Sequence, residues 1–234
     1  MSVFNLTELL LSLMMIGSAS GLVSEEYING LEGLQNNNGE NIVIEEVNQD
    51  SNEINNLNDQ ENEEINIEEM VKELPVVGIG DSVMLGAVAN LNELFPNGIF
   101  DGKVSRNIYG AISVAQTLKD EGKIGNPVII GIGTNGEASK TKRDEIMNII
   151  GEDKVCFWVT VTNDQSVHAN ANIRNYPEQY PNMHIIDWET ISKEHPDYFY
   201  KDGIHLTPAG RKAYANAVYD AIYNYYLEEY GNKA

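Results

Sequence analysis

Ser82, Asp202 and His205 have the side chains, and the positions in the sequence, from which one catalytic group could be built. Ser82 directly follows a short apolar run and opens a segment with helical periodicity. Asp202 and His205 are three residues apart, just before the last helical segment. On a tight turn this spacing lets the carboxylate accept the Nδ1–H of the imidazole, so that Nε2 can take a proton from a serine hydroxyl. The pattern predicts acyl transfer through a nucleophilic serine.

Each of these residues also has an ordinary structural interpretation. Ser82 could simply cap the helix that it opens, because serine is a common N-cap residue. Asp202 and His205 could form half of a metal site or a structural hydrogen bond. A metal site would need further ligands, and the other histidines show no ligand spacing with His205. We therefore expect no metal ion and no cofactor.

Asn135 offers a further group for the same chemistry. It follows a fully apolar run, in the sequence Gly-Thr-Asn-Gly, and its side-chain amide could donate to an oxyanion beside Ser82. The helix that begins at Ser82 would add backbone N–H groups and a partial positive charge. Taken alone, Asn-Gly is more simply a turn pair. The combination of this asparagine with Ser82 and the Asp-x-x-His turn favours catalysis.

The elements that must position these residues alternate regularly from residue 74 onward. Apolar runs predict strands at 75–80, 99–104, 127–132, 154–161 and 183–187. Helical patterns lie at 81–95, 111–121, 142–150, 166–176 and 208–230, the last with Thr207 as N-cap and Tyr214, Val218, Ile222 and Tyr225 on one face. Runs that are apolar throughout indicate a parallel sheet covered on both faces. We predict an α/β three-layer sandwich with five parallel strands and the reactive residues at the strands' carboxyl ends.

The motifs at 80–82, 133–136 and 202–210, which read GDS, GTNG and DGIHLTPAG, resemble the SGNH hydrolase superfamily. The closer likeness is to the extracytoplasmic domain of peptidoglycan O-acetyltransferases, and it covers essentially all of residues 74–234. It implies a flavodoxin-like fold, with Ser82 as nucleophile, His205 as base and Asp202 orienting the imidazole. The Gly-Asp-Ser start departs from the G-x-S-x-G elbow, which argues against an ordinary α/β-hydrolase.

The resemblance also implies an oxyanion hole. The backbone N–H of Ser82 and the side chain of Asn135 would contribute to it. The superfamily usually adds a glycine N–H from its second block, and Ser105 stands at the matching place here. Ser105 would therefore contribute through its backbone.

Two enzymatic functions would use this machinery. An O-acetyltransferase would pass an acetyl group from Ser82 to a hydroxyl of cell-wall glycan, such as the C6 hydroxyl of N-acetylmuramic acid. An extracellular carbohydrate acetylesterase or lipase-like hydrolase would give the same acyl-enzyme to water. The two use the same residues, because only the fate of the acyl-enzyme differs. A catalytically silent glycan-binding module is a third interpretation, which an intact triad disfavours.

Aromatic residues near the catalytic turn are candidates for contacts with sugar. Tyr198, Phe199 and Tyr200 come directly before the turn, and Trp188 is a further candidate. We expect Trp158 in the core, because it lies inside an apolar run. For His195, before Pro196, we expect a structural role.

The negative charge of the chain is concentrated in one segment. The net charge is −21, and residues 24–73 hold fifteen Asp or Glu and twelve Asn with a single Lys. Such a composition cannot bury enough apolar surface to offset chain entropy, so it predicts a disordered linker. No Lys or Arg cluster offers a phosphate-binding surface, which excludes nucleic acid as a partner. The lone cysteine, Cys156, lies in an apolar run and is expected to be a buried thiol.

Residues 1–23 form an apolar, signal-like or membrane-anchor segment. Small residues follow its apolar core as they do in a signal peptide, but Glu8 and the lack of Lys or Arg depart from that pattern. A signal peptide, an anchor and the tail of a truncated membrane domain remain open. We expect an extracytoplasmic bacterial cell-envelope protein, secreted or held at the membrane. Relatives with this domain commonly carry a multi-span membrane acyltransferase domain. Three alternatives follow: a separate membrane acyltransferase delivers the acetyl donor, the chain is truncated, or the domain works alone.

Overall fold

The computed structural model describes residues 66–162 and 166–231 of the 234-residue chain. The segment expected at 1–23, and residues 24–65 of the expected linker, lie outside these ranges. Inside them, none of the helices combines the length and the apolar character needed to cross a membrane.

Five short strands form a parallel sheet in the described part of the chain. They are β1 (Val77–Gly80), β2 (Ile99–Gly102), β3 (Val128–Gly131), β4 (Cys156–Val159) and β5 (Met183–Ile186). Their order across the sheet is β2-β1-β3-β4-β5, and all neighbours are parallel. Every residue of β1, β3 and β4 is buried, which explains why these segments are apolar throughout. The predicted α/β sandwich with five parallel strands is confirmed.

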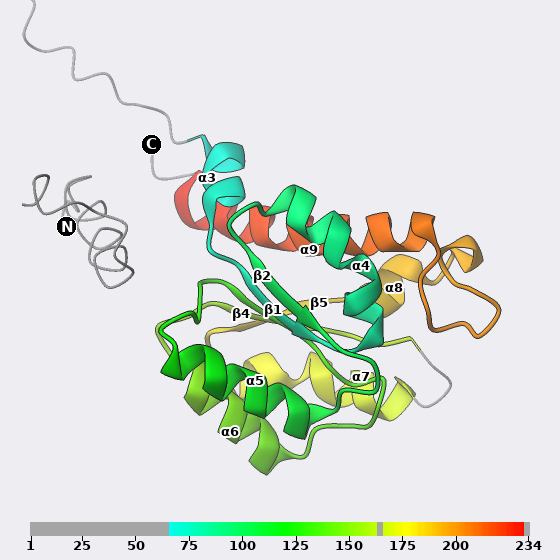
Figure 1. Cartoon of the computed structure of the whole chain (residues 1–234), viewed down its shortest axis with the longest axis horizontal. Coiled ribbons are helices and arrows are strands. Elements are labelled where there is room, and N and C mark those ends of the chain that lie inside the picture. Colours follow the sequence, from blue (N-terminus) through cyan, green and yellow to red (C-terminus); the bar gives the residue numbers. More distant parts are fainter. Residues whose placement is uncertain (1–65, 163–165, 232–234) are drawn as a thin grey trace, which may run out of the picture. The chain divides into compact units, whose positions relative to one another are not determined.

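Helices cover both faces of the sheet (Figure 1). One face carries α4 (Ser82–Leu94) and α9 (Pro208–Tyr230), and the other carries α5 (Ile108–Asp120), α6 (Lys140–Ile150) and α7 (Ser166–Arg174). Shorter elements are α8 (Trp188–Ser192) and the 3₁₀ turns η2 (Tyr176–Glu178) and η3 (Pro196–Tyr198). A separate apolar core fills each of the two layers between sheet and helices.

The last helix, α9, begins as its sequence predicts. Thr207 is the N-cap, and its side chain accepts a hydrogen bond from the backbone of Gly210 at 3.2 Å. The expected row of Tyr214, Val218 and Ile222 is buried. That row continues to Tyr226, which is buried, while the predicted Tyr225 is partly buried and packs against the same core.

The prediction of a disordered linker over 24–73 is wrong for its last eight residues. Residues 67–73 form a helix, α3 (Ile67–Glu73), which packs against α9. Asn66 caps it, and Ile67 and Val71 are buried in the core shared with α9. The apolar residues at 67, 70, 71 and 74 follow helical spacing, but they lie among acidic side chains that dominate the composition. The folded domain therefore includes residues 66–73, which precede its expected start at residue 74.

Candidate active site

The strand order brings three of the predicted site residues to one edge of the sheet. β1 lies between β2 and β3, and the last residues of the three strands are in register. The loops after these strands therefore begin side by side, at the point where the chain switches from one side of β1 to the other. Ser82 follows β1, Ser105 follows β2 and Asn135 follows β3.

The start of α4 leaves the hydroxyl of Ser82 available for chemistry. The N-cap is Asp81, whose side chain accepts from the backbone N–H of Val83 at 2.9 Å. Ser82 is thus the first residue inside the helix, and the interpretation of Ser82 as the capping residue is wrong. Asp81 is 1% exposed, and burial raises the pKa of its carboxyl, although hydrogen bonds from Val83 and Thr134 act in the opposite direction.

The structure brings together the side chains of Ser82, His205 and Asp202. His205 Nε2 lies 3.1 Å from Ser82 Oγ, and His205 Nδ1 lies 2.9 Å from Asp202 Oδ2. An ionised carboxylate only accepts hydrogen bonds, so Nδ1 carries the proton and Nε2 is the acceptor for the serine hydroxyl. The three groups are therefore arranged for proton transfer from Ser82 to His205.

A tight turn holds Asp202 and His205 in this arrangement. Asp202 Oδ1 accepts from the backbone N–H groups of Ile204 and His205, each at 2.9 Å. Gly203 has φ +68°, a conformation that residues with a Cβ rarely adopt. The hydrogen bond from His205, followed by the two backbone N–H groups, lowers the pKa of Asp202 to about 2. The carboxylate is therefore ionised at neutral pH.

Short-range contacts close the loop that carries this turn. Phe199 and Leu206 form an antiparallel bridge, and the N–H of Tyr200 donates to the carbonyl of His205 at 2.8 Å. The hydroxyl of Thr207, the N-cap of α9, donates to the carbonyl of Asp197 at 2.7 Å. The start of α9 and the turn at 202–205 are thus one hydrogen-bonded unit.

The groups expected to form an oxyanion hole come from the loops that follow the neighbouring strands β1, β2 and β3. As the first residue of α4, Ser82 has a backbone N–H without an acceptor within its own helix. Ser105 has φ +56°, in the region that favours glycine, at the place where the superfamily usually has glycine. Asn135 Nδ2 donates one hydrogen to the carbonyl of Arg106 at 3.1 Å, and the amide carries a second N–H. Asn135 is therefore tied to the loop that contains Ser105.

Of the aromatic candidates for sugar contact, Trp188 is a wrong prediction. Its side chain is 1% exposed, because it packs against Tyr198, Phe199 and Tyr214. Trp158 is fully buried, as expected, and Tyr200 is exposed.

His195 lies with its ring stacked on Tyr198, at 4.3 Å between ring centres. This packing agrees with the structural role expected for it.

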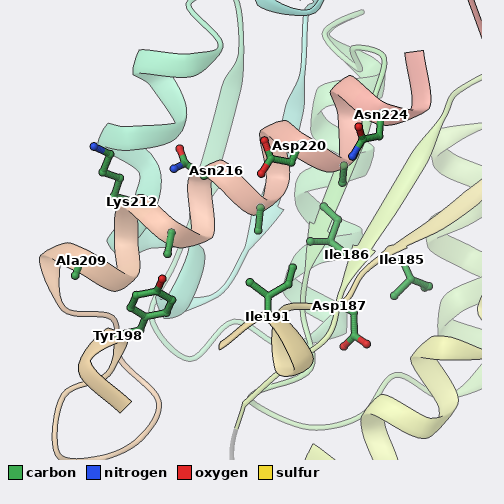
Figure 2. Close-up of a pocket in the computed structure, with 13 residues that line it drawn as sticks. Ile185, Ile186, Asp187, Ile191, Tyr198, Ala209, Lys212, Asn216, Asp220 and Asn224 are labelled. Carbon is green, nitrogen blue, oxygen red and sulfur yellow. The ribbon is translucent and has the colours of Figure 1, made fainter. Parts of the chain in front are cut away.

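A groove along α9 has Tyr198 in its lining but not Ser82 or His205 (Figure 2). It has a volume of about 660 Å³ and runs between α9, α8 and the edge strand β5. Lys212, Asn216 and Asp220 of α9 and Ile191 of α8 are also among its lining residues. Within residues 66–162 and 166–231, the structure has no group of three or more His, Cys, Asp or Glu side chains that could hold a metal ion.

Comparison with known proteins relates this fold and sequence to one class of enzyme. No protein-family model matches the chain. O-acetyltransferase OatA of Staphylococcus aureus (strain NCTC 8325) is 34% identical over 155 residues, which are 65% of this chain and 26% of that protein. The solved C-terminal catalytic domain of Streptococcus pneumoniae peptidoglycan O-acetyltransferase OatA is 25% identical, with a TM-score of 0.58; the match covers 69% of this chain and 97% of that domain. Over about two thirds of its length, this chain is therefore similar to OatA proteins.

The fold that this chain shares with OatA is also that of lipolytic enzymes. A lipase/acylhydrolase from Enterococcus faecalis matches with a TM-score of 0.54 at 13% identity, over 64% of this chain and 95% of the other. The resemblance to SGNH hydrolases and to peptidoglycan O-acetyltransferases is thereby confirmed. The chain spans about a quarter of the length of the S. aureus OatA that it matches.

Two residues of the site, Asp81 and Arg106, were not singled out from the sequence. An aspartate directly after a strand and before a helical pattern is a common N-cap, so Asp81 could have been recognised as the cap of α4. Arg106 stands in a polar loop and is 7% exposed. The sequence around Arg106 does not signal that burial, because one of its acceptors, the carbonyl of Gly80, comes from β1, 26 residues earlier.

Proposed function

We propose that residues 66–231 form an O-acetyltransferase domain that acts on cell-wall glycan through an acetyl-enzyme at Ser82. The observation that carries this proposal is the hydrogen-bonded series from Ser82 to His205 to Asp202, at the sheet edge that also carries Asn135. The names of the OatA homologues support the acetyl group and the peptidoglycan acceptor.

In the first half-reaction, Ser82 takes the acetyl group from a donor ester. His205 Nε2 accepts the proton as Ser82 Oγ bonds to the acetyl carbonyl carbon. The carbonyl oxygen becomes negatively charged, and the N–H groups of Ser82, Ser105 and Asn135 stabilise it. When the carbon–oxygen bond to the donor breaks, His205 returns the proton to the leaving oxygen.

In the second half-reaction, a glycan hydroxyl takes the place of the donor. His205 removes the proton of that hydroxyl as its oxygen attacks the acetyl-enzyme, and the bond to Ser82 Oγ then breaks. The proton passes to Ser82, which regenerates the starting state. Ionised Asp202 stabilises the imidazolium in both half-reactions. Water can replace the glycan hydroxyl without any change in these roles, so hydrolysis is the competing outcome.

A peptidoglycan acceptor supports a location of this domain in the bacterial cell envelope. Peptidoglycan lies outside the cytoplasmic membrane, so we infer an extracytoplasmic location, with residues 1–23 as the proposed contact to the membrane. We propose that a membrane acyltransferase delivers the acetyl group.

The test is a transfer assay with the purified protein. An activated acetyl ester is supplied with and without peptidoglycan oligosaccharides, and O-acetylated sugar and free acetate are both measured by mass spectrometry. We expect acetyl sugar that requires the oligosaccharide and is lost in Ser82→Ala, His205→Ala and, to a slightly smaller extent, Asp202→Asn. Free acetate as the sole product at every oligosaccharide concentration would instead identify an esterase.

A further inference from the structure

Arg106 holds the carboxyl ends of β1 and β2 together. It directly follows Ser105, and its side chain is buried. One guanidinium nitrogen, Nη1, donates to the carbonyl of Gly80 at 2.9 Å and to the carbonyl of Asp101. The other, Nη2, pairs with the carboxylate of Asp101 at 2.7 Å. A single side chain thus joins the strand end before the nucleophile to the strand end before Ser105.

The backbone of Arg106 extends this connection to the loop after β3. Its carbonyl accepts from the side chain of Asn135 at 3.1 Å, and its N–H donates to Lys103 at 3.2 Å. Ser105, directly before it, is exposed and has φ +56°. A non-glycine residue keeps such a conformation only where its surroundings determine it. Arg106 is the buried residue directly after Ser105, and its contacts hold the backbone on the carboxyl side of Ser105.

We propose that Arg106 is the positioning residue of the oxyanion hole. It fixes the N–H of Ser105 and the amide of Asn135 relative to Ser82, and so sets where a negatively charged oxygen is stabilised. This inference rests on the proposed function, because it assumes acyl transfer at Ser82. Oxyanion donors act only within a few tenths of an ångström of their productive positions, so the residue that holds them has a large effect on rate.

The chemistry of arginine explains why this position requires it. Its planar fork donates several hydrogen bonds in fixed directions, which matches two carbonyls and one carboxylate. Lysine would keep the positive charge, but its single nitrogen on a flexible stem cannot hold the three acceptors in the same geometry. Arg106→Lys therefore removes the fixed hydrogen-bond geometry of this side chain and keeps its positive charge.

Arg143 on α6 provides a matched control. It is also 7% exposed, donates to the carbonyl of Ala138 at 2.7 Å and lies over the ring of Tyr176 at 4.3 Å. It is therefore a buried arginine with comparable packing on the opposite face of the sheet from Ser82. Any loss that follows only from disturbing a buried arginine should be the same in Arg143→Lys and Arg106→Lys.

The experiment measures kcat, KM and the unfolding midpoint of both variants with a small acetyl ester. We expect both to unfold at lower temperature, and only Arg106→Lys to lose kcat, by roughly 10- to 100-fold with KM within about twofold. Asp101→Asn, which weakens one contact of Arg106 and alters no oxyanion donor, should give a smaller loss of the same kind. Unchanged kcat in Arg106→Lys, or an equal loss in Arg143→Lys, would overturn the proposal.

A second measurement does not depend on turnover. In ¹H–¹⁵N spectra, the side-chain amide of Asn135 and the backbone N–H of Ser105 should shift in Arg106→Lys and stay in place in Arg143→Lys. Unshifted signals would overturn the positioning role. If Ser82→Ala retained wild-type turnover, the proposed function would fail, and these spectra would still decide whether Arg106 positions the two groups.

Discussion

Ser82 is free to react because its neighbour supplies the cap of α4. Asp81 accepts the N–H of Val83, so the hydroxyl of Ser82 makes its hydrogen bond with His205 instead. The same helix start directs backbone N–H groups and a partial positive charge toward the carbon that Ser82 would attack. At the residue scale, two aspartates make different contacts: Asp81 caps α4, and Asp202 is hydrogen-bonded to the imidazole of His205.

The ionisation of Asp202 can be tested by its titration. Its pKa is lowered to about 2, and the hydrogen bond from His205 is the largest cause. Because the pKa is lowered, the ionised carboxylate stabilises the turn at pH values above the ordinary pKa of 3.8. This stabilisation is lost as the pH falls toward 2. We expect a ¹³C carboxyl midpoint near 2 in the wild type and a higher midpoint in His205→Ala. Equal midpoints in the two proteins would show that His205 does not hold this carboxylate.

Ser105→Gly tests whether Ser105 acts through its backbone. At φ +56° glycine relieves strain, so the free energy of unfolding should stay the same or rise by up to about 1 kcal/mol. The turnover of a small acetyl ester should be unchanged, because the N–H is retained. Ser105→Val should instead lower both stability and kcat, since β-branched residues tolerate this conformation poorly. A tenfold loss of kcat in Ser105→Gly would point to the hydroxyl group.

At the scale of the elements, the unexpected feature is α3. Its buried residues, Ile67 and Val71, belong to the same core as α9, at the amino-terminal boundary of the described domain. The acidic residues around them face solvent, and one of them, Glu68, pairs with Lys72 at 2.8 Å. A segment can therefore be acidic in composition and still dock through one apolar stripe.

The contribution of α3 can be measured by truncation. A protein of residues 74–234 should be less stable than one of residues 66–234, because it lacks this helix. Val71→Ala alone should lower the free energy of unfolding by about 2 kcal/mol, or the melting temperature by about 4–8 °C. The control Glu69→Ala, at an exposed position of the same helix, should change it by less than about 0.5 kcal/mol. Equal melting temperatures for the two truncated proteins would contradict a stabilising α3.

What the sequence could predict follows from how local each signal is. The buried strands were recognisable because strands covered on both faces are apolar throughout, and Ser82, Asp202 and His205 because they stand at strand and helix ends. The burial of Trp188 and Arg106 was not recognisable, because it depends on residues distant in the sequence. Arg106 contacts Gly80, 26 residues before it, and only the pairing of β1 with β2 brings them together.

At the scale of the whole described domain, the parallel sheet converts distance in sequence into proximity. Ser82 and His205 are 123 residues apart, yet α4 and the loop before α9 meet at the carboxyl edge of the sheet (Figure 1). The two cores fix the sheet between its helix layers, so the loops at that edge start from a rigid base. The sheet and its helices therefore hold the proposed reactive residues in place, and short loops are enough to carry them.

The central claim, an acetyl-enzyme at Ser82, is tested most directly by trapping it. The protein is mixed with an activated acetyl ester, quenched in acid within seconds and analysed by mass spectrometry, before and after proteolysis. We predict the mass of one added acetyl group on the peptide that contains Ser82, its absence from Ser82→Ala, and its loss when peptidoglycan oligosaccharide is added before the quench. An acetyl group on another residue, or turnover within tenfold of wild type in a folded Ser82→Ala protein, would contradict the account.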